Sequence, residues 1–170
     1  MKPEPSAKQD AQTMPITAVP APIPFTHPWE YELRFPRDPR GPGIARATLR
    51  TILAAHGLDE LTDRAVLLAC ELATNSIRYT PGPASVRLRW EHPVLRVSVT
   101  DPSPVFPVQL APPGPEADGG RGLLILDLVA DHWGGCCLDE TLFGEGGKVI
   151  WFELRLDPGP PTPATATLVA

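Results

Sequence analysis

The chain has 170 residues, of which 42% are apolar and 21% are charged, and its formal net charge at pH 7 is -5. This length suits one compact domain with tails, and the negative charge disfavours a nucleic-acid partner held by bulk electrostatics. No apolar run approaches the about 20 residues that a membrane span needs, and residues 1–28 lack the apolar segment of a signal peptide. We therefore expect a cytoplasmic protein without a membrane partner.

The distribution of proline predicts the domain boundaries. Prolines are frequent in residues 1–28 and again after residue 157, and they are absent between residues 43 and 80 and between 116 and 157. Proline-rich ends with little to bury are typical of disordered tails. We expect a folded domain over residues 29–156, with disordered tails over 1–28 and 157–170.

The cysteines predict no disulfide framework. They are an odd set, Cys70, Cys136 and Cys137, and the last two are adjacent. Free cysteine is usually a small, buried packing residue. We therefore expect three buried cysteines in a reducing compartment.

The first half of the chain predicts a strand followed by two helices. Residues 30–35 alternate apolar and polar side chains, which indicates a half-buried strand. Residues 44–56 carry apolar side chains at helical spacing up to Gly57, a residue type that often ends a helix. The next helix is expected over residues 61–79, with Thr62 as its N-cap.

The second half predicts a hairpin, a long loop, a helix and two more strands. Residues 85–90 and 95–100 both alternate with period two around a short His-Pro turn, as hairpin strands do. Residues 102–120 have no periodic pattern, and loops of that length are usually functional or disordered. After the loop we expect a well-buried helix and then two strands, over residues 121–131, 135–139 and 148–156.

The resulting order, β-α-α-β-β-α-β-β, keeps strands and helices in separate groups. Such an order is typical of an α+β two-layer sandwich. We expect a mostly antiparallel mixed sheet that is covered on one face by helices.

A pair of polar residues in the predicted helix 61–79 is the first candidate site. Glu71 and Asn75 are four residues apart and share one helical face, and Arg78 follows close to it. A carboxylate can orient or deprotonate a hydroxyl group, and a carboxamide oxygen is a hard ligand that suits Mg²⁺. A plain solvent-facing pair is the alternative interpretation, because such pairs are common on wet helix faces.

Two further segments carry candidate ligand-binding residues. Asp101 ends a predicted strand, where a carboxylate can accept a hydrogen bond from an exocyclic amine such as that of adenine. Gly119 and Gly120 lead into a predicted helix, where glycines let backbone amides approach an anion. Taken alone, each segment is also consistent with an ordinary turn.

Together these segments resemble the ATP-binding domain shared by histidine kinases, gyrase and related ATPases. More narrowly, the chain is similar to the stand-alone anti-sigma-factor serine kinases of actinomycetes. The segments that carry the likeness are residues 71–79, 99–101, 120–126, 131–134 and 147–154. The resemblance covers about residues 30–156 and implies the histidine-kinase-like ATPase fold.

The resemblance also implies a reaction and its cofactors, ATP and Mg²⁺. Glu71 would be the catalytic base toward a serine or threonine of an antagonist protein, and Asn75 would be the magnesium ligand. Asp101 would accept the adenine amino group. The other nucleotide-binding positions implied are Arg78, Gly120, Arg121, Gly122 and Leu123. The implied partners are a sigma factor and the anti-anti-sigma antagonist, and a homodimer is compatible with the resemblance.

Two departures from the family pattern leave a second hypothesis open. Pro102 and Pro104 stand where the family has a glycine-containing segment after the aspartate, and residues 147–149, near the start of the last strand, carry no hydroxyl group where the family often has a threonine. The alternative is therefore a non-catalytic module that keeps the fold and sequesters a regulator. A third hypothesis, metal-dependent hydrolysis, lacks metal-ligand spacing at its candidate residues, His56, Glu71, His92 and His132.

Overall fold

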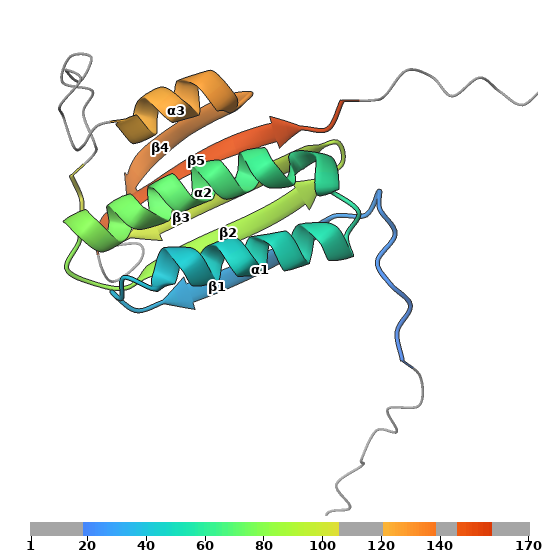
Figure 1. The fold of residues 1–170 in the computed structure, drawn as a ribbon, viewed down its shortest axis with the longest axis horizontal. Helices are drawn as coiled ribbons and strands as arrows, with labels where there is room; N and C mark the ends of the chain where they lie inside the picture. The colour runs from blue at the N-terminus through green and yellow to red at the C-terminus, as the bar shows by residue number, and fades with distance from the viewer. Residues whose placement is uncertain (1–18, 106–120, 139–145, 158–170) are drawn as a thin grey trace, which may run out of the picture.

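The computed structural model describes residues 19–105, 121–138 and 146–157 of the chain. The strands are β1 (Trp29–Phe35), β2 (Ala84–Glu91), β3 (Val94–Asp101), β4 (His132–Leu138) and β5 (Gly147–Arg155). The helices are α1 (Gly41–Ala55), α2 (Asp59–Tyr79) and α3 (Arg121–Val129). The helices cover one face of the sheet (Figure 1). The predicted element order and the α+β sandwich are therefore confirmed.

The strands form one five-stranded sheet in the order β1-β2-β3-β5-β4. All four pairings within the described part are antiparallel, so the mixed sheet that we expected is wrong in that respect. The chain passes from β3 through α3 to the edge strand β4 and then returns to β5, which lies beside β3. This return places the end of β3 directly opposite the start of β5, with Asp101 in register with Lys148.

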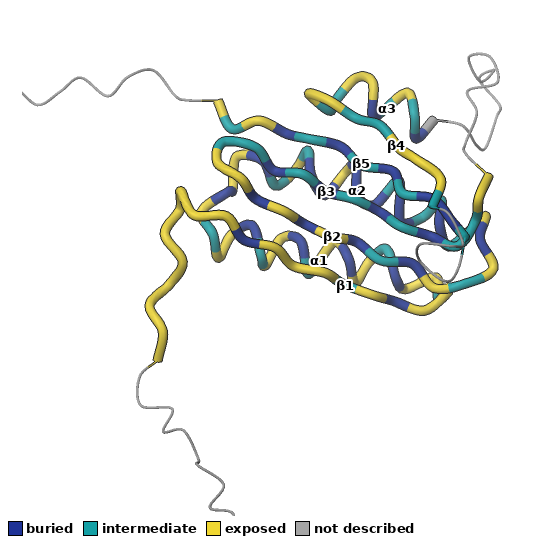
Figure 2. Tube along the Cα trace, turned by 180° about the vertical axis from the view of Figure 1, so that it is seen from behind, coloured by how far each residue is buried: buried dark blue, intermediate teal, exposed yellow. Residues whose placement is uncertain are grey.

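The hydrophobic core lies between the helices and the inner face of the sheet. Buried and exposed residues alternate along β2, because successive side chains of a strand point to opposite faces (Figure 2). The largest fully buried side chains come from both layers and include Trp90, Leu88, Leu95, Phe152 and Leu154 of the sheet and Leu49, Leu53, Leu61 and Leu68 of the helices. Burial of this kind of apolar surface is the main force that holds α1 and α2 on the sheet.

The outer face of the sheet carries charged side chains instead. Arg87 of β2 lies 2.9 Å from Glu32 of β1, and Arg96 of β3 lies 3.2 Å from Glu153 of β5. These cross-strand pairs are exposed or half-buried, and such pairs contribute little stability each.

Within the described residues, no helix is both long enough and apolar enough to cross a bilayer.

The junction between α1 and α2 shows why these helices end and begin where they do. Gly57 has a positive φ of 70°, and the N–H of Leu58 reaches back to the carbonyl of Leu53 at 2.9 Å, which closes the end of α1 as predicted. The predicted N-cap of α2 is wrong. The helix begins at Asp59, and the Thr62 hydroxyl donates to the Leu58 carbonyl at 3.2 Å from inside the first turn.

Helix α3 is less buried than its apolar sequence predicts. Leu126 is 1% exposed, but Leu124 is 44% and Leu128 is 75% exposed. The helix has nine residues and lies at the β4 side of the sheet, with α2 on one side only (Figure 1). A helix in that position covers one stripe of its surface, so the rest of its apolar residues remain in contact with solvent.

The cysteine prediction is correct for one residue and wrong for two. Cys70 of α2 is buried, whereas Cys136 and Cys137 are exposed, and all three are free. The two exposed residues lie on β4, an edge strand of the sheet, where neither face has a full covering layer.

Asp131 ties the end of α3 to α2 and β5. Its Oδ1 accepts a hydrogen bond from Arg64 of α2 at 3.0 Å, and its Oδ2 accepts one from the backbone N–H of Arg155 at 2.6 Å. Arg64 also donates to the carbonyl of Val129 at 2.7 Å. Burial raises the pKa of Asp131, but the bonds from Arg155 and Arg64 and the Arg64 charge outweigh it, so this pKa is lowered from 3.8.

We expect Asp131→Asn to lower the free energy of unfolding by about 1–2 kcal/mol at neutral pH, because two bonds to a charged acceptor are weakened at a partly exposed site. A depressed pKa in the folded state gives stability that is present above the ordinary pKa of 3.8 and is lost as pH falls through the folded-state pKa. The difference between the two proteins should therefore vanish in acid. Urea unfolding of the native protein and the variant, at neutral pH and in acid, measures this difference in the free energy of unfolding.

Asp63→Asn is the matched control, because Asp63 pairs with Arg50 at 3.3 Å but its side chain is 92% exposed. That variant should unfold like the native protein. A loss at Asp131→Asn that is equal at neutral and acid pH would contradict the assigned charge effect.

Candidate functional site

Helix α2 presents Glu71 and Asn75 one turn apart on one face, as predicted. Both residues are half-buried. Within the described part of the chain, neither side chain forms a hydrogen bond or an ion pair. A carboxylate and a carboxamide are thus available to a bound molecule in the middle of the helix.

Asn75 lies against the first turn of α3. A Cβ built on Gly122 would be only 2.8 Å from the Asn75 Nδ2 atom, so any side chain at position 122 would have to displace the carboxamide. The first backbone N–H groups of a helix have no partner within the helix and favour an anion. The Asn75 carboxamide therefore lies, by its Nδ2 atom, beside an anion-favouring helix end.

This part of the site fits Mg²⁺ that is bound together with a phosphate group. Mg²⁺ usually takes one or two protein ligands and completes its shell with phosphates and water. Among the described residues, no group of three or more histidine, cysteine, aspartate or glutamate side chains is arranged to hold a metal. A cation here would depend on phosphate oxygens in addition to Asn75.

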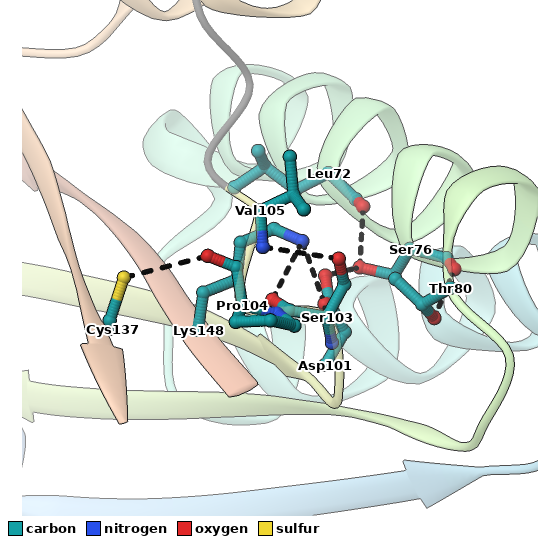
Figure 3. Close-up of polar contacts among 9 residues, drawn as sticks. All are labelled: Leu72, Ser76, Thr80, Asp101, Ser103, Pro104, Val105, Cys137 and Lys148. Atoms are coloured by element: carbon teal, nitrogen blue, oxygen red, sulfur yellow. Dashed lines mark hydrogen bonds and ion pairs between the residues drawn. The ribbon is translucent and has the colours of Figure 1, made fainter. Parts of the chain in front are cut away.

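Asp101 lies at the inner face of the sheet, at the end of β3, and is 5% exposed. Its Oδ2 lies 3.0 Å from the Ser76 hydroxyl, which is also 3.1 Å from the Leu72 carbonyl and has one proton to share between them. Figure 3 shows this contact between the strand end and α2. The structure therefore joins Asp101 to α2 through Ser76, the neighbour of Asn75.

Lys148 is the closest charged partner of Asp101. Its Nζ donates to Asp101 Oδ1 at 2.8 Å, and the two side chains are 8% and 4% exposed. The same ammonium also reaches the Ser103 carbonyl at 3.4 Å (Figure 3). A buried charge is tolerated only with a partner, so each of these two residues accounts for the burial of the other.

The residue before Lys148 allows this close approach. A Cβ on Gly147 would collide with the backbone carbonyl of Asp101 and would lie 3.2 Å from the Cα of Pro102. Backbone atoms cannot move aside as the end of a flexible side chain can. Glycine at position 147 is therefore needed for β3 and β5 to meet at this end of the sheet.

The segment after Asp101 folds back onto its carboxylate. The N–H of Ser103 donates to Asp101 Oδ1 at 2.9 Å, and the N–H of Val105 donates to the Ser103 hydroxyl at 3.3 Å. Pro102 packs against Gly82, where a Cβ would be 2.8 Å from the proline ring. The stiff Pro-Ser-Pro segment is thus fixed beside the acid instead of leaving it open.

The remaining predicted positions divide into those that the structure describes and those that it does not. Arg78 is exposed at the end of α2, and Leu123 is half-buried against the core. Gly119, Gly120 and the Arg121 side chain lie outside the described residues. The structure therefore brings Asn75 and Gly122 together directly, and it connects Asp101 to the same helix by way of Ser76.

Sequence reasoning missed Ser76 and the pairing of Lys148 with Asp101. A signal was present, because Lys148 is an isolated cation at an inward position of a strand whose other inward residues are apolar. The acid end of the site consequently does not fit an adenine amino group as it stands, whereas the Asn75 end fits a magnesium phosphate.

Three comparisons with known proteins bear on this arrangement. A family model described as the histidine kinase-like ATPase domain matches residues 35–152. No curated protein matches the chain. The fold is similar to that in the crystal structure of the RsbU and RsbW domains of Rv1364c from Mycobacterium tuberculosis, with a TM-score of 0.54 and 19% identity. The match covers 75% of this chain and 32% of that chain, and at this identity it shows the fold alone.

Proposed function

Because the chain belongs to the histidine kinase-like ATPase domain family, we propose that it is an ATP-binding regulatory protein of the anti-sigma-factor type. It transfers the γ-phosphoryl group of ATP to a serine or threonine of an antagonist protein and thereby controls a sigma factor. The observation that carries this proposal is the position of Asn75, one turn after Glu71 and in contact with Gly122 at the start of α3. In this proposal Asn75 supplies a cation ligand beside an anion-favouring helix end, and Glu71, one turn earlier on α2, supplies the general base.

Each of these residues has a role in the proposed transfer. Asn75 would hold Mg²⁺ through its carboxamide oxygen, and the first turn of α3 would receive phosphate oxygens. Glu71 accepts the proton of the attacking hydroxyl group. Phosphoryl transfer depends mainly on positioning and on neutralising charge. The hydroxyl oxygen would bond to the γ-phosphorus while the bond from that phosphorus to the β,γ-bridging oxygen breaks, and ADP would leave.

A second candidate is a regulator-binding module that performs no phosphoryl transfer. The buried pair of Lys148 and Asp101, together with the fixed segment from Pro102 to Pro104, favours it. In that case the fold holds a sigma factor or another regulator, and Asp101 acts as a structural residue.

Calorimetric titration with MgATP distinguishes the two candidates. We expect the native protein to bind MgATP, and we expect Asn75→Ala to weaken binding about tenfold or more, because a ligand contact to a charged group is lost. Leaving out Mg²⁺ should weaken binding by the native protein and change little in the variant. Thr74→Ala is the matched control, since Thr74 is the half-buried neighbour of Asn75 on the same helix.

Label transfer from radioactive ATP to the cognate antagonist then tests the kinase activity. Transfer by the native protein, with the label on serine or threonine, supports the first candidate. MgATP binding without transfer, or no binding by the folded native protein, rejects the kinase and leaves the binding module.

A further inference from the structure

Asp101 is the residue expected to accept a hydrogen bond from the nucleotide base, but one of its two carboxylate oxygens already accepts two hydrogen bonds. Asp101 Oδ1 accepts both the Lys148 ammonium at 2.8 Å and the Ser103 N–H at 2.9 Å. A carboxylate oxygen has about two lone-pair positions, so Oδ1 has none left. Oδ2 keeps one position beside Ser76, but the side chain is only 4% exposed.

We propose that Lys148 occupies the acceptor on Asp101 that the 6-amino group of adenine would use, so the base contributes little to nucleotide binding in this protein. The inference rests on the proposed function, because it concerns the same nucleotide site. Affinity then comes from the phosphate end, where Asn75 meets Gly122. Nucleoside triphosphates that lack the 6-amino group should bind almost as well as ATP.

The balance of charge explains why adenine does not simply displace the lysine. The ammonium is a charged donor, and its hydrogen bond to a carboxylate is stronger than one from a neutral amine. Removing it from Asp101 would leave a cation without its ion-pair partner in a position that is 8% exposed. Its other described contact is the Ser103 carbonyl at 3.4 Å, which cannot neutralise a charge.

The native protein provides the first test. MgATP and the magnesium complex of purine riboside triphosphate, which carries hydrogen in place of the 6-amino group, are titrated against it by calorimetry. We expect the two dissociation constants to agree within about threefold. A site in which Asp101 accepts the amine would prefer ATP by about tenfold to a hundredfold, the range for a hydrogen bond to a charged group.

Lys148→Thr provides the second test, because it removes the ammonium and leaves Asp101 free to accept. In this variant MgATP should bind at least about tenfold more tightly than in the native protein, and a preference for ATP over the analogue should appear. Arg89→Thr is the matched control, since it removes one cation from an exposed position of β2. Its two affinities should equal those of the native protein.

The outcomes separate this inference from the proposed function. A native preference for ATP of tenfold or more overturns the inference and keeps ATP binding. No nucleotide binding by the native protein, with binding of ATP restored by Lys148→Thr, supports the block of Asp101 by Lys148 but overturns both the affinity expected from the phosphate end and the proposed kinase. No binding by either folded protein overturns both. If Lys148→Thr does not fold, the titrations of the native protein decide the question alone.

Discussion

Asp101→Asn and Lys148→Met, each made alone, should lower the free energy of unfolding by about 3–5 kcal/mol, because each leaves an unpartnered charge in the interior. The two side chains are 4% and 8% exposed, and their charged atoms are 2.8 Å apart. The double variant should recover most of the loss, since replacing a whole buried ion pair is often close to neutral. Urea unfolding of the four proteins gives the coupling energy as a double-mutant cycle.

The exposed pair of Arg89 and Glu91 is the control for this cycle. Its charged atoms are also 2.8 Å apart, but the side chains are 55% and 63% exposed. Glu91→Gln should cost less than about 1 kcal/mol. Single variants at Asp101 and Lys148 that lose no more than this control would contradict the buried ion pair.

Glu71→Gln should slow phosphoryl transfer to the antagonist about 100- to 10,000-fold, the usual contribution of a general base. Glutamine keeps the size of the side chain but does not accept the hydroxyl proton. MgATP affinity should stay within about twofold of the native value, because this residue is assigned to the acceptor hydroxyl and not to the nucleotide. Single-turnover transfer and calorimetric titration measure the two effects separately.

Glu60→Gln is the matched control, because Glu60 is an exposed carboxylate in the first turn of the same helix. It should change neither transfer nor affinity. If Glu71→Gln transfers phosphate at the native rate, the base lies elsewhere. If affinity and transfer fall together, Glu71 acts in nucleotide binding.

The sequence predicted the fold well where a periodic pattern reflected burial against the sheet. Strands β2 and β3 alternate inward and outward residues along nearly their whole length, and their predicted bounds differ from the observed ones by one residue at each end. The resemblance to histidine-kinase-like ATPases, which was drawn from five short segments between residues 71 and 154, is confirmed by the match over residues 35–152. The end of α1 was predictable because a left-handed residue favours glycine, which Gly57 provides.

The errors arose where packing or register, and not local pattern, decides the structure. The start of α2 has no side-chain cap, and Thr62, the predicted N-cap, lies inside the helix. The apolar residues of α3 predicted burial, but Leu128 stays exposed because the helix has a neighbour on one side only.

Only part of the candidate site could be predicted, because the sequence shows local helical spacing but not the pairing of distant strands. The relation of Glu71 to Asn75 follows from helical spacing alone. The pair formed by Asp101 and Lys148 depends on the register of two strands that are joined through α3 and β4. The sequence shows that residues 147–149 carry no hydroxyl group. Only the pairing of β3 with β5 shows that Lys148 contacts Asp101.

Gly147 has a consequence for how variation in this protein should be interpreted. It bears no chemical group, yet its bare backbone sets the separation at which a cation and an acid on adjoining strands meet. A methyl group at position 147 would push β3 and β5 apart at this end of the sheet. A substitution that appears conservative, at a residue without a functional group, would thus disturb the ion pair between Lys148 and Asp101.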